Sequence, residues 1–344
     1  MLESTLTGAM VATGVLTWGL GLGALGASVW RALRGRARED ITGQWIAVTG
    51  CDSGFGQGVV GELIDRKAHV IALCLTQEGA DAASRRGAAL ALVLDLTDDA
   101  GLTAISRDIE VACEGRLSGL VHNAGVVLPG FIEYQPIGFY RRVMDVNFFA
   151  PVLLTQRLLP SLRRARGRVV LISSVDGIVS LPGNAPYDAS KFALEAYADA
   201  LRAELSLWGL RVSVVNPSTM RTPLALRFFE AHRATWEEMS RLDPDGSWKD
   251  IWSAEWLEAY IAFNTAQLDR IAQDPVHAIR DVVHALTARR PRLRYLSGTA
   301  AKTVFRALWL APEGWSLAFK RLIIYPRPPS AKPAVSSAAS ASRG

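Results

Sequence analysis

Apolar residues in the central part of the chain form short unbroken runs that alternate with longer stretches of helical periodicity. The runs are rich in Val, Ile and Leu and contain few polar residues, which is typical of parallel strands buried on both faces. Amphipathic stretches such as residues 100–113 and 187–208 separate them. This alternation predicts an α/β fold in which one doubly wound parallel sheet of about seven strands carries helices on both faces. The expected strands are residues 45–50, 69–75, 88–96, 119–122, 168–173, 211–215 and 293–297.

The N-terminal segment has a different pattern. Residues 4–30 contain no charged side chain, and at helical rise this run is long enough to cross the hydrocarbon core of a bilayer. A cleaved signal peptide would have a basic start, whereas this chain begins MLES, with Glu3 and no Lys or Arg. The basic stretch RALRGRAR that follows predicts that the main domain stays in the cytosol. We therefore expect a single-pass transmembrane helix in residues 1–30, a basic linker in 31–43 and a location in the endoplasmic reticulum membrane.

The C-terminal part is mixed in character. Residues 303–325 are apolar and rich in tryptophan, but four charged residues interrupt them, so they suit a membrane interface better than a span. Packing against the globular domain is the alternative. Residues 326–344 are rich in Pro, Ser and Ala and are expected to be disordered. The expected catalytic domain is 44–300, and 301–325 is the segment that could associate with a membrane.

Composition narrows the class of protein. Hydrophobic residues make up 49% of the chain and charged residues 21%, close to the average of soluble globular domains. The net charge is +5, but the arginines cluster near the ends and no basic helix alternates with aromatic residues, which argues against nucleic acid as a partner. The three cysteines form no CxxC pair, so neither a disulfide framework nor a metal site is expected.

A glycine-rich stretch, VTGCDSGFGQG at residues 48–58, follows the first expected strand. Its spacing, G-x-x-x-G-x-G, suits a tight turn, a close approach of the backbone to a pyrophosphate, and close packing of the next helix on the sheet. The N-terminus of that helix offers free N–H groups to an anion. An ordinary glycine turn is the alternative. The residues expected to bind a dinucleotide here are Gly50, Asp52, Ser53, Gly54, Phe55 and Gly56.

Residues at the end of the second strand help to select between NAD and NADP. This stretch reads ALCLTQEG. Neither the usual ribose-binding acid nor an Arg for the 2′-phosphate of NADP stands there. The charge of Asp52 disfavours that phosphate, and no Lys or Arg within residues 51–55 offsets it, so NAD is expected rather than NADP. Asp95, followed by Leu96, could accept a bond from the adenine amino group, or it could cap the next helix.

Tyr187 and Lys191 lie four residues apart at the start of an amphipathic stretch, so both side chains project from one helix face. An ammonium one turn away favours the phenolate and lowers a tyrosine pKa, which makes the tyrosine a usable general acid and base. The YxxxK pattern alone is common by chance. Its context adds weight, because Ser174 ends an apolar strand and could hydrogen-bond a substrate oxygen, while Asn147 is an unusual polar residue in an apolar helical run.

Taken together, these motifs resemble the short-chain dehydrogenase/reductase family, whose fold is a Rossmann-like sheet. TGxxxGxG at 49–56, Asn-Ala-Gly at 123–125, Asn147, Ser174 and YxxxK occur in the family's order. The resemblance implies that Tyr187 exchanges a proton with the substrate oxygen and that Ser174 orients this oxygen. It also implies that Lys191 lowers the Tyr187 pKa and binds the nicotinamide ribose, and that Asn147 supports a proton-relay water. Further cofactor-binding positions implied by the resemblance are Asn123, Ala124, Gly125, Pro217 and Thr222, with Tyr187 and Lys191.

Two positions depart from the family pattern. His122 stands where the family has a second Asn before Asn-Ala-Gly, and Ser218 stands where a Gly usually follows Pro217. A narrower resemblance comes from TGCDSGFG, the CLT at residues 74–76 and HALTARRPRLRY at 284–295. These are similar to the branch of membrane-bound retinol and hydroxysteroid dehydrogenases, which also includes 3-hydroxybutyrate dehydrogenase and mostly uses NAD(H).

The resemblance also bears on the substrate. Residues 222–275 form an insertion that covers the substrate in this family, and an aromatic cover suits a lipophilic steroid or retinoid alcohol or ketone. Packing of a helical lid is the alternative for each aromatic residue. A short-chain 3-hydroxy acid is the second candidate substrate. A catalytically idle NAD-binding scaffold at the membrane is a different function, which the intact catalytic set disfavours.

The family is often dimeric or tetrameric, so a homodimer or homotetramer is expected by analogy. The aromatic residues are Phe228, Phe229, Trp236, Trp248, Trp252, Trp256, Tyr260 and Phe263, and the cations that could meet a hydroxy acid are Arg221, Arg227 and Arg233.

Overall fold

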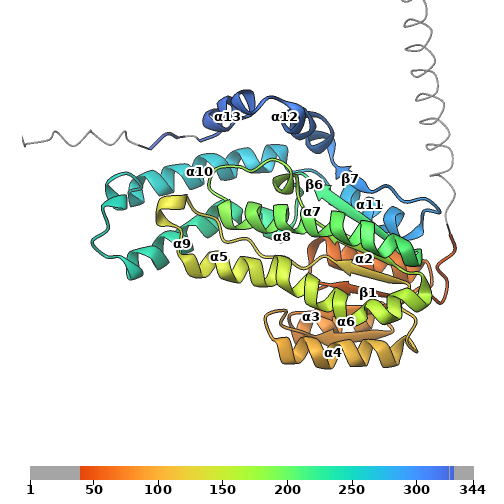
Figure 1. Ribbon diagram of the computed structural model, residues 1–344. Coiled ribbons are helices and arrows are strands. Elements are labelled where there is room, and N and C mark those ends of the chain that lie inside the picture. Colours follow the sequence, from red (N-terminus) through yellow and green to blue (C-terminus); the bar gives the residue numbers. More distant parts are fainter. Residues whose placement is uncertain (1–38, 325, 329–344) are drawn as a thin grey trace, which may run out of the picture.

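A parallel sheet forms the centre of the computed structural model, which describes residues 39–324 and 326–328. Its seven strands have the order β3-β2-β1-β4-β5-β6-β7, and every neighbouring pair is parallel. Helices lie on both sides of the sheet (Figure 1), so the predicted fold class is confirmed. The strands are β1 Trp45–Thr49, β2 His69–Cys74, β3 Leu90–Val93, β4 Gly119–His122, β5 Arg168–Ile172, β6 Arg211–Pro217 and β7 Arg294–Ser297.

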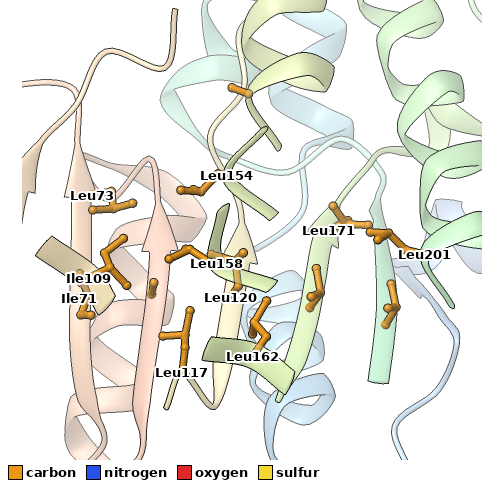
Figure 2. Packing of buried hydrophobic residues seen from close by; sticks show 14 of the residues in the cluster. Ile71, Leu73, Ile109, Leu117, Leu120, Leu154, Leu158, Leu162, Leu171 and Leu201 are labelled. Carbon is orange, nitrogen blue, oxygen red and sulfur yellow. The ribbon is translucent and has the colours of Figure 1, made fainter. Parts of the chain in front are cut away.

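Successive residues of each strand contribute to two separate cores. In β1, Ala47 packs into one core, whereas Ile46 and Val48 pack into the other, as the alternation of side chains along a strand requires. Figure 2 shows the first core, in which Leu120 of β4 and Leu171 of β5 lie under leucines from the covering helices. The first core is covered by α4 Asp99–Ala112, α6 Ala150–Ala165 and α7 Ala185–Leu205, and the second by α2 Gly54–Asp65, α3 Gln77–Arg86 and α11 Val276–Thr287.

The sheet topology determines where a ligand can bind. The chain runs from β1 outward to β2 and β3, then returns to the other side of β1 to form β4 and the remaining strands. In sheets of this kind, ligands bind outside the carboxyl ends of the strands at this reversal. The glycine loop follows β1 and Ser174 follows β5, so both lie at that edge.

The remaining described elements connect the strands and helices already named or follow β7. A third, smaller core is formed by the insertion after β6 together with Phe131 and Tyr134. The elements are η1 Ile132–Tyr134, α5 Ile137–Met144, η2 Asp145–Phe149, η3 Val175–Gly177, η4 Ser206–Trp208, α8 Pro223–Leu226, α9 Phe228–Leu242, η5 Ser247–Asp250, α10 Ala254–Ile271, η6 Ala301–Phe305, α12 Arg306–Leu310 and α13 Glu313–Leu322.

The membrane predictions concern the two ends. Within residues 39–324 and 326–328, no helix combines the length and the apolar character that a bilayer span needs. The run at 4–30 that was predicted to span lies outside the described residues, as do 329–344 of the predicted tail. The C-terminal segment forms two short helices, α12 and α13, and not one continuous helix.

Candidate active site

The glycine loop after β1 is shaped by close backbone contacts. Gly50 has a φ of 68°, in the left-handed region, and a Cβ placed on it would lie 2.7 Å from the Ala124 Cα. A Cβ on Gly56 would lie 2.1 Å from the Gly50 carbonyl oxygen. Ser53 is the N-cap residue of α2, so the first N–H groups of this helix point into the loop. The loop therefore has the geometry of an anion-binding cradle at a helix N-terminus.

Asn123 holds the glycine loop to the segment after β4. Its Nδ2 donates to the Thr49 and Gly50 carbonyl oxygens, at 2.9 Å each. In return, the Thr49 hydroxyl oxygen accepts bonds from the backbone N–H groups of Asn123 and Ala124, at 3.0 Å each. The Asn-Ala-Gly motif thus fixes the backbone of the cradle.

The Asp52 carboxylate is directed to the end of β2. It accepts hydrogen bonds from the Leu75 N–H at 2.8 Å, the Thr76 N–H at 2.9 Å and the Thr76 hydroxyl at 2.7 Å. Thr76 in turn caps α3 by accepting a bond from the Gly79 N–H. A negative charge therefore stands at the strand end where ribose-binding acids are expected, although it comes from the glycine loop.

Asp95 lies at the end of the segment after β3 and forms a local turn. Its carboxylate accepts bonds from the Thr97 N–H at 2.9 Å and the Thr97 hydroxyl at 2.8 Å, which lower its pKa. The N-cap of α4 is Asp98 instead, so the helix-cap alternative for Asp95 is wrong. Leu96 beside it is partly buried against the first core.

The predicted catalytic residues come together at the end of β5 and the start of α7. Ser174 is buried and caps η3, and its carbonyl oxygen accepts a bond from the Asn216 Nδ2 at 2.8 Å. Tyr187 lies in the first turn of α7 and Lys191 in the next. The Lys191 Nζ lies 5.4 Å from the centre of the Tyr187 ring and donates to the Ile172 carbonyl oxygen at 2.8 Å.

Asn147 lies in η2, a π-helical turn between α5 and α6. Such turns often mark functional positions in helices. Its Nδ2 donates to the Val126 carbonyl oxygen and to the Ser190 hydroxyl, at 3.0 Å each, and its Oδ1 accepts from the Val126 N–H at 2.8 Å. Asn147 therefore clamps the segment after Gly125 to helix α7.

Burial has the largest effect on the acid–base properties of this cluster. The pKa of Tyr187 is raised, first by burial and then by the negative charges of Asp176 and Asp188, while a hydrogen bond with Ser174 lowers it. Burial also lowers the pKa of Lys191 to about 8. The pKa of Tyr187 is therefore raised on balance, although the Lys191 ammonium lies one helical turn away; the lowering effect of Lys191 stays a prediction.

Both departures from the family pattern have local explanations. His122 is buried with its Nε2 2.8 Å from the Thr155 hydroxyl oxygen, and burial lowers its pKa to about 3, so it is neutral. Ser218 is absent from the residues with positive φ, so this position does not need a glycine. Its N–H donates to the Ser297 carbonyl oxygen at 3.0 Å, which ties the segment after Pro217 to the end of β7.

Thr222 is the N-cap of α8 and brings the insertion to the glycine loop. Its Cβ and Cγ2 lie 3.7 Å from where a Cβ on Gly54 would stand. Thr222 therefore lies beside the glycine loop, and its contact with the nicotinamide stays a prediction.

The aromatic residues of the insertion mostly pack against one another. Trp248, Trp256 and Tyr260 are buried in the third core with Phe131 and Tyr134. Phe131 stacks on Trp252 with ring centroids 4.4 Å apart, and Phe229, Trp236 and Trp252 pack at the margin, while Phe263 is exposed. For the buried members, the lid-packing alternative is the one that the structure supports.

The three arginines considered for a hydroxy acid lie at the surface. Arg221 and Arg227 are exposed, and Arg233 forms a two-pronged ion pair with Glu258 at 2.8 and 2.7 Å on the surface.

Comparison with known proteins decides the family. The family model described as short chain dehydrogenase matches residues 44–232. This chain belongs to the short-chain dehydrogenase family. The human protein "Retinol dehydrogenase 5" is 36% identical over 296 residues, covering 83% of this chain and 90% of its own length. The human "Dehydrogenase/reductase SDR family member 9" is 33% identical and covers 84% of this chain and 90% of its own length.

Solved structures agree on the fold. A short-chain dehydrogenase/reductase from Burkholderia phymatum in complex with NAD has a TM-score of 0.63 at 20% identity, covering 81% of this chain and 96% of its own. One from Burkholderia cenocepacia in complex with NADP has a TM-score of 0.60 at 22% identity, covering 81% and 98%. This short-chain dehydrogenase is therefore an oxidoreductase acting on CH–OH groups, of the retinol dehydrogenase branch, and it works with a nicotinamide cofactor.

Several residues of this short-chain dehydrogenase site were not found from the sequence. Asp176 and Asp188 flank the catalytic pair, and Asn216 donates to both Ser174 and Glu195. The acidic residues are visible in SSVDG and PYDAS, where their position next to Ser174 and Tyr187 is the signal. Asn216 gives no local signal, because its partners are distant in the sequence.

Proposed function

We propose that this enzyme is an NAD(H)-dependent dehydrogenase that interconverts a lipophilic primary or secondary alcohol, of the retinoid or steroid class, with its aldehyde or ketone. The observation that carries this proposal is the charge around Tyr187. Asp176 and Asp188 lie beside it, whereas Arg221, Arg227 and Arg233 are exposed and Arg233 is paired with Glu258. A carboxylate substrate would be repelled there, and a neutral alcohol would not.

The residues of the cradle fit a dinucleotide. Gly50 and Gly56 permit backbone contacts that a Cβ would block, and the N-terminus of α2 follows this tight loop, where its N–H groups can hold a pyrophosphate. NAD is the preferred form in this proposal, because the Asp52 charge at the end of β2 opposes a 2′-phosphate and residues 74–79 contain no Lys or Arg. Once bound, a nicotinamide supplies the hydride chemistry.

The chain's own residues handle the substrate oxygen and its proton. In alcohol oxidation, the Tyr187 oxygen takes the hydroxyl proton while the carbinol carbon gives up its hydride, and in carbonyl reduction Tyr187 returns the proton. The Ser174 hydroxyl, which acts to lower the Tyr187 pKa, orients the substrate oxygen beside Tyr187. The Lys191 ammonium, one turn away, stabilises negative charge that develops on the Tyr187 oxygen.

A matrix of two cofactors against three substrates tests this function. With NAD⁺ we expect turnover of all-trans-retinol or an androgen, with kcat/KM at least about tenfold above the value with NADP⁺, since each 1.4 kcal/mol of discrimination gives a factor of ten. We expect no turnover of 3-hydroxybutyrate. Turnover of 3-hydroxybutyrate alone would overturn the lipophilic-alcohol assignment, and a preference for NADP⁺ would overturn the role of Asp52.

We propose further that residues 1–30 anchor the enzyme in a membrane, with the catalytic domain in the cytosol. The C-terminal segment could lie at the same surface, because Trp309, Leu310, Trp315, Leu317 and Leu322 are exposed on α12 and α13. A lipophilic substrate would then reach the site from the lipid.

Deletion of residues 1–30 is expected to move the protein from the membrane pellet to the supernatant after alkaline carbonate extraction, while the full chain stays in the pellet. A second variant, with Trp309 and Trp315 changed to Ser in the full chain, serves as the control and should stay in the pellet. Retention of the truncated protein would contradict the N-terminal anchor and assign anchoring to residues 303–325.

A further inference from the structure

The C-terminal helices α12 and α13 are attached to the catalytic domain at two places. On the side of β7, the Arg294 guanidinium lies over the Trp309 ring of α12, 5.4 Å from its centroid. Beyond α13, Ile324 packs against the third core, and the Pro326 carbonyl oxygen accepts a bond from the Trp256 Nε1 at 3.1 Å. Between these attachments the two helices cross the outside of the domain (Figure 1).

A cleft of about 550 Å³ lies between these helices and the catalytic domain. This volume is within the range of about 300–1,000 Å³ that is typical of ligand pockets. Large apolar side chains form both walls, and several keep much of their surface accessible. The walls are Ile178, Val179 and Phe192 on the domain side, and Leu308, Trp309 and Leu317 on the helix side.

The cleft is next to the catalytic centre but separate from it. Phe192 follows Lys191 on α7, yet the Lys191 Nζ donates to the Ile172 carbonyl oxygen in the interior, whereas Phe192 is 43% exposed and lines the cleft. Of the described residues that line the cleft, none is Ser174, Tyr187 or Lys191. A ligand in the cleft would therefore lie on the opposite side of this part of α7 from the reacting groups.

Helix α13 has two faces with different surroundings. Four of its residues recur at spacings of three and four and so share the face that lines the cleft. They are Glu313, Ser316, Leu317 and Lys320. Trp315 and Leu322, seven residues apart, are 76% and 69% exposed on another face. Exposed Trp and Leu side chains on a short helix suit a lipid surface, so a hydrocarbon ligand could reach the cleft directly from lipid.

The polar groups of the cleft favour a neutral ligand. The Lys320 Nζ donates to the Ser180 Oγ at 3.3 Å, and both residues line the cleft. The charge of Lys320 is balanced by that of Glu313 in the same lining, so a carboxylate would gain no net attraction. An alcohol hydroxyl both donates and accepts hydrogen bonds, and it can therefore bond to the hydroxyl, ammonium or carboxylate groups present.

We propose that this cleft binds a neutral lipophilic alcohol at a site separate from the catalytic centre. The hydrocarbon part lies between Phe192, Trp309 and Leu317, and the hydroxyl meets the polar groups of Ser180 and Lys320. The choice of an alcohol over other neutral lipids rests on the proposed function, because the site then holds molecules of the substrate's class beside the enzyme that converts them. The apolar walls and the balanced charges stand without it.

A substitution that fills the cleft tests the site. Gly314 lines the cleft, and a Cβ placed on it would have no neighbour within 4 Å, so Gly314→Phe can occupy the space without displacing other groups. The matched control is Gly138→Phe on α5, because a Cβ there also has no neighbour within 4 Å and Gly138 does not line the cleft.

The measurement is photolabelling of the full chain in detergent micelles by hexadecanol that carries a diazirine, with the labelled residues identified by mass spectrometry. In the wild type and in Gly138→Phe, we expect label within residues 178–192 and 308–320. In Gly314→Phe this label should fall at least about tenfold, as for the loss of one good apolar contact surface. Label confined to residues 222–275, or label at the cleft that Gly314→Phe leaves unchanged, would overturn the inference.

Competition and kinetics test the class of ligand and the separateness of the site. Unlabelled hexadecanol should displace the probe better than hexadecanoate, and the reverse order would overturn the assignment to a neutral alcohol. Gly314→Phe should keep the wild-type kcat with saturating retinol and NAD⁺, and a loss of kcat together with the label would show that the cleft belongs to the catalytic centre. Absence of turnover in the wild type with every alcohol would overturn the proposed function alone, because the labelling needs neither cofactor nor turnover.

Discussion

Replacement of Tyr187 by Phe is expected to lower kcat for alcohol oxidation at least about a hundredfold, the lower range of general acid–base contributions, while NADH still binds. Phe keeps the ring that lies beside Lys191 but has no oxygen to take or return the substrate proton. NADH binding persists because the substitution leaves the glycine loop intact. Gly50 and Gly56 shape this loop, and Asn123 holds it in place. The measurements are steady-state kinetics and a fluorescence titration with NADH.

Tyr197→Phe is the matched control for this experiment. Tyr197 lies on the same helix and its side chain hydrogen-bonds Thr155, so its replacement removes a phenol from α7 without touching Ser174. It should keep the wild-type kcat. A Tyr187→Phe enzyme with most of its activity intact would contradict the assignment of Tyr187 as the proton-transferring group.

The parts of this site that could be predicted from sequence are those encoded within a few residues. The glycine spacing, the apolar runs of the strands and the four-residue separation of Tyr187 and Lys191 each define a local geometry. All seven strands lie within or next to their predicted ranges for this reason, with β3 shorter and β6 longer than expected.

The parts that could not be predicted depend on contacts between distant segments. The direction of the Tyr187 pKa shift follows from burial and from the placement of Asp176 by the η3 turn. Asp52 stands in the glycine loop, and only the fold brings its carboxylate to Leu75 and Thr76 at the end of β2. No local pattern states which of these distant groups will meet.

The burial of the aromatic residues in the insertion also depends on contacts with distant segments, so it could not be predicted from the sequence. A run of aromatic residues can line a pocket or fill a lid, and both patterns look alike in sequence. Here Phe131 and Tyr134, which precede the insertion by about a hundred residues in the chain, complete an aromatic core with Trp248, Trp252 and Trp256. These rings are buried because they pack against Phe131 and Tyr134, which lie outside the insertion.

Replacement of Gly56 by Ala is expected to weaken NADH binding at least about tenfold and to lower the free energy of unfolding by about 1–3 kcal/mol, the usual cost of an overpacked site. The new Cβ would lie 2.1 Å from the Gly50 carbonyl oxygen and 2.5 Å from the Asn123 Nδ2. The first neighbour is backbone and the second is the side chain that holds it, so neither can move without opening the cradle. Fluorescence titration with NADH and chemical denaturation measure the two effects.

Gly61→Ala separates this local effect from any general effect of alanine in α2. A Cβ at Gly61 would have the Arg86 Nε as its nearest neighbour, at an ordinary contact distance of 3.6 Å. Alanine is the better helix former, so this variant should bind NADH as the wild type does and gain roughly 0.5–1 kcal/mol in stability. Equal NADH affinity in Gly56→Ala and Gly61→Ala would show that the cradle does not hold the nucleotide. Tyr187→Phe is expected to lose turnover but keep NADH binding, whereas Gly56→Ala is expected to weaken NADH binding itself. The two variants therefore distinguish a proton-transferring part of the site on α7 from a nucleotide-binding part after β1.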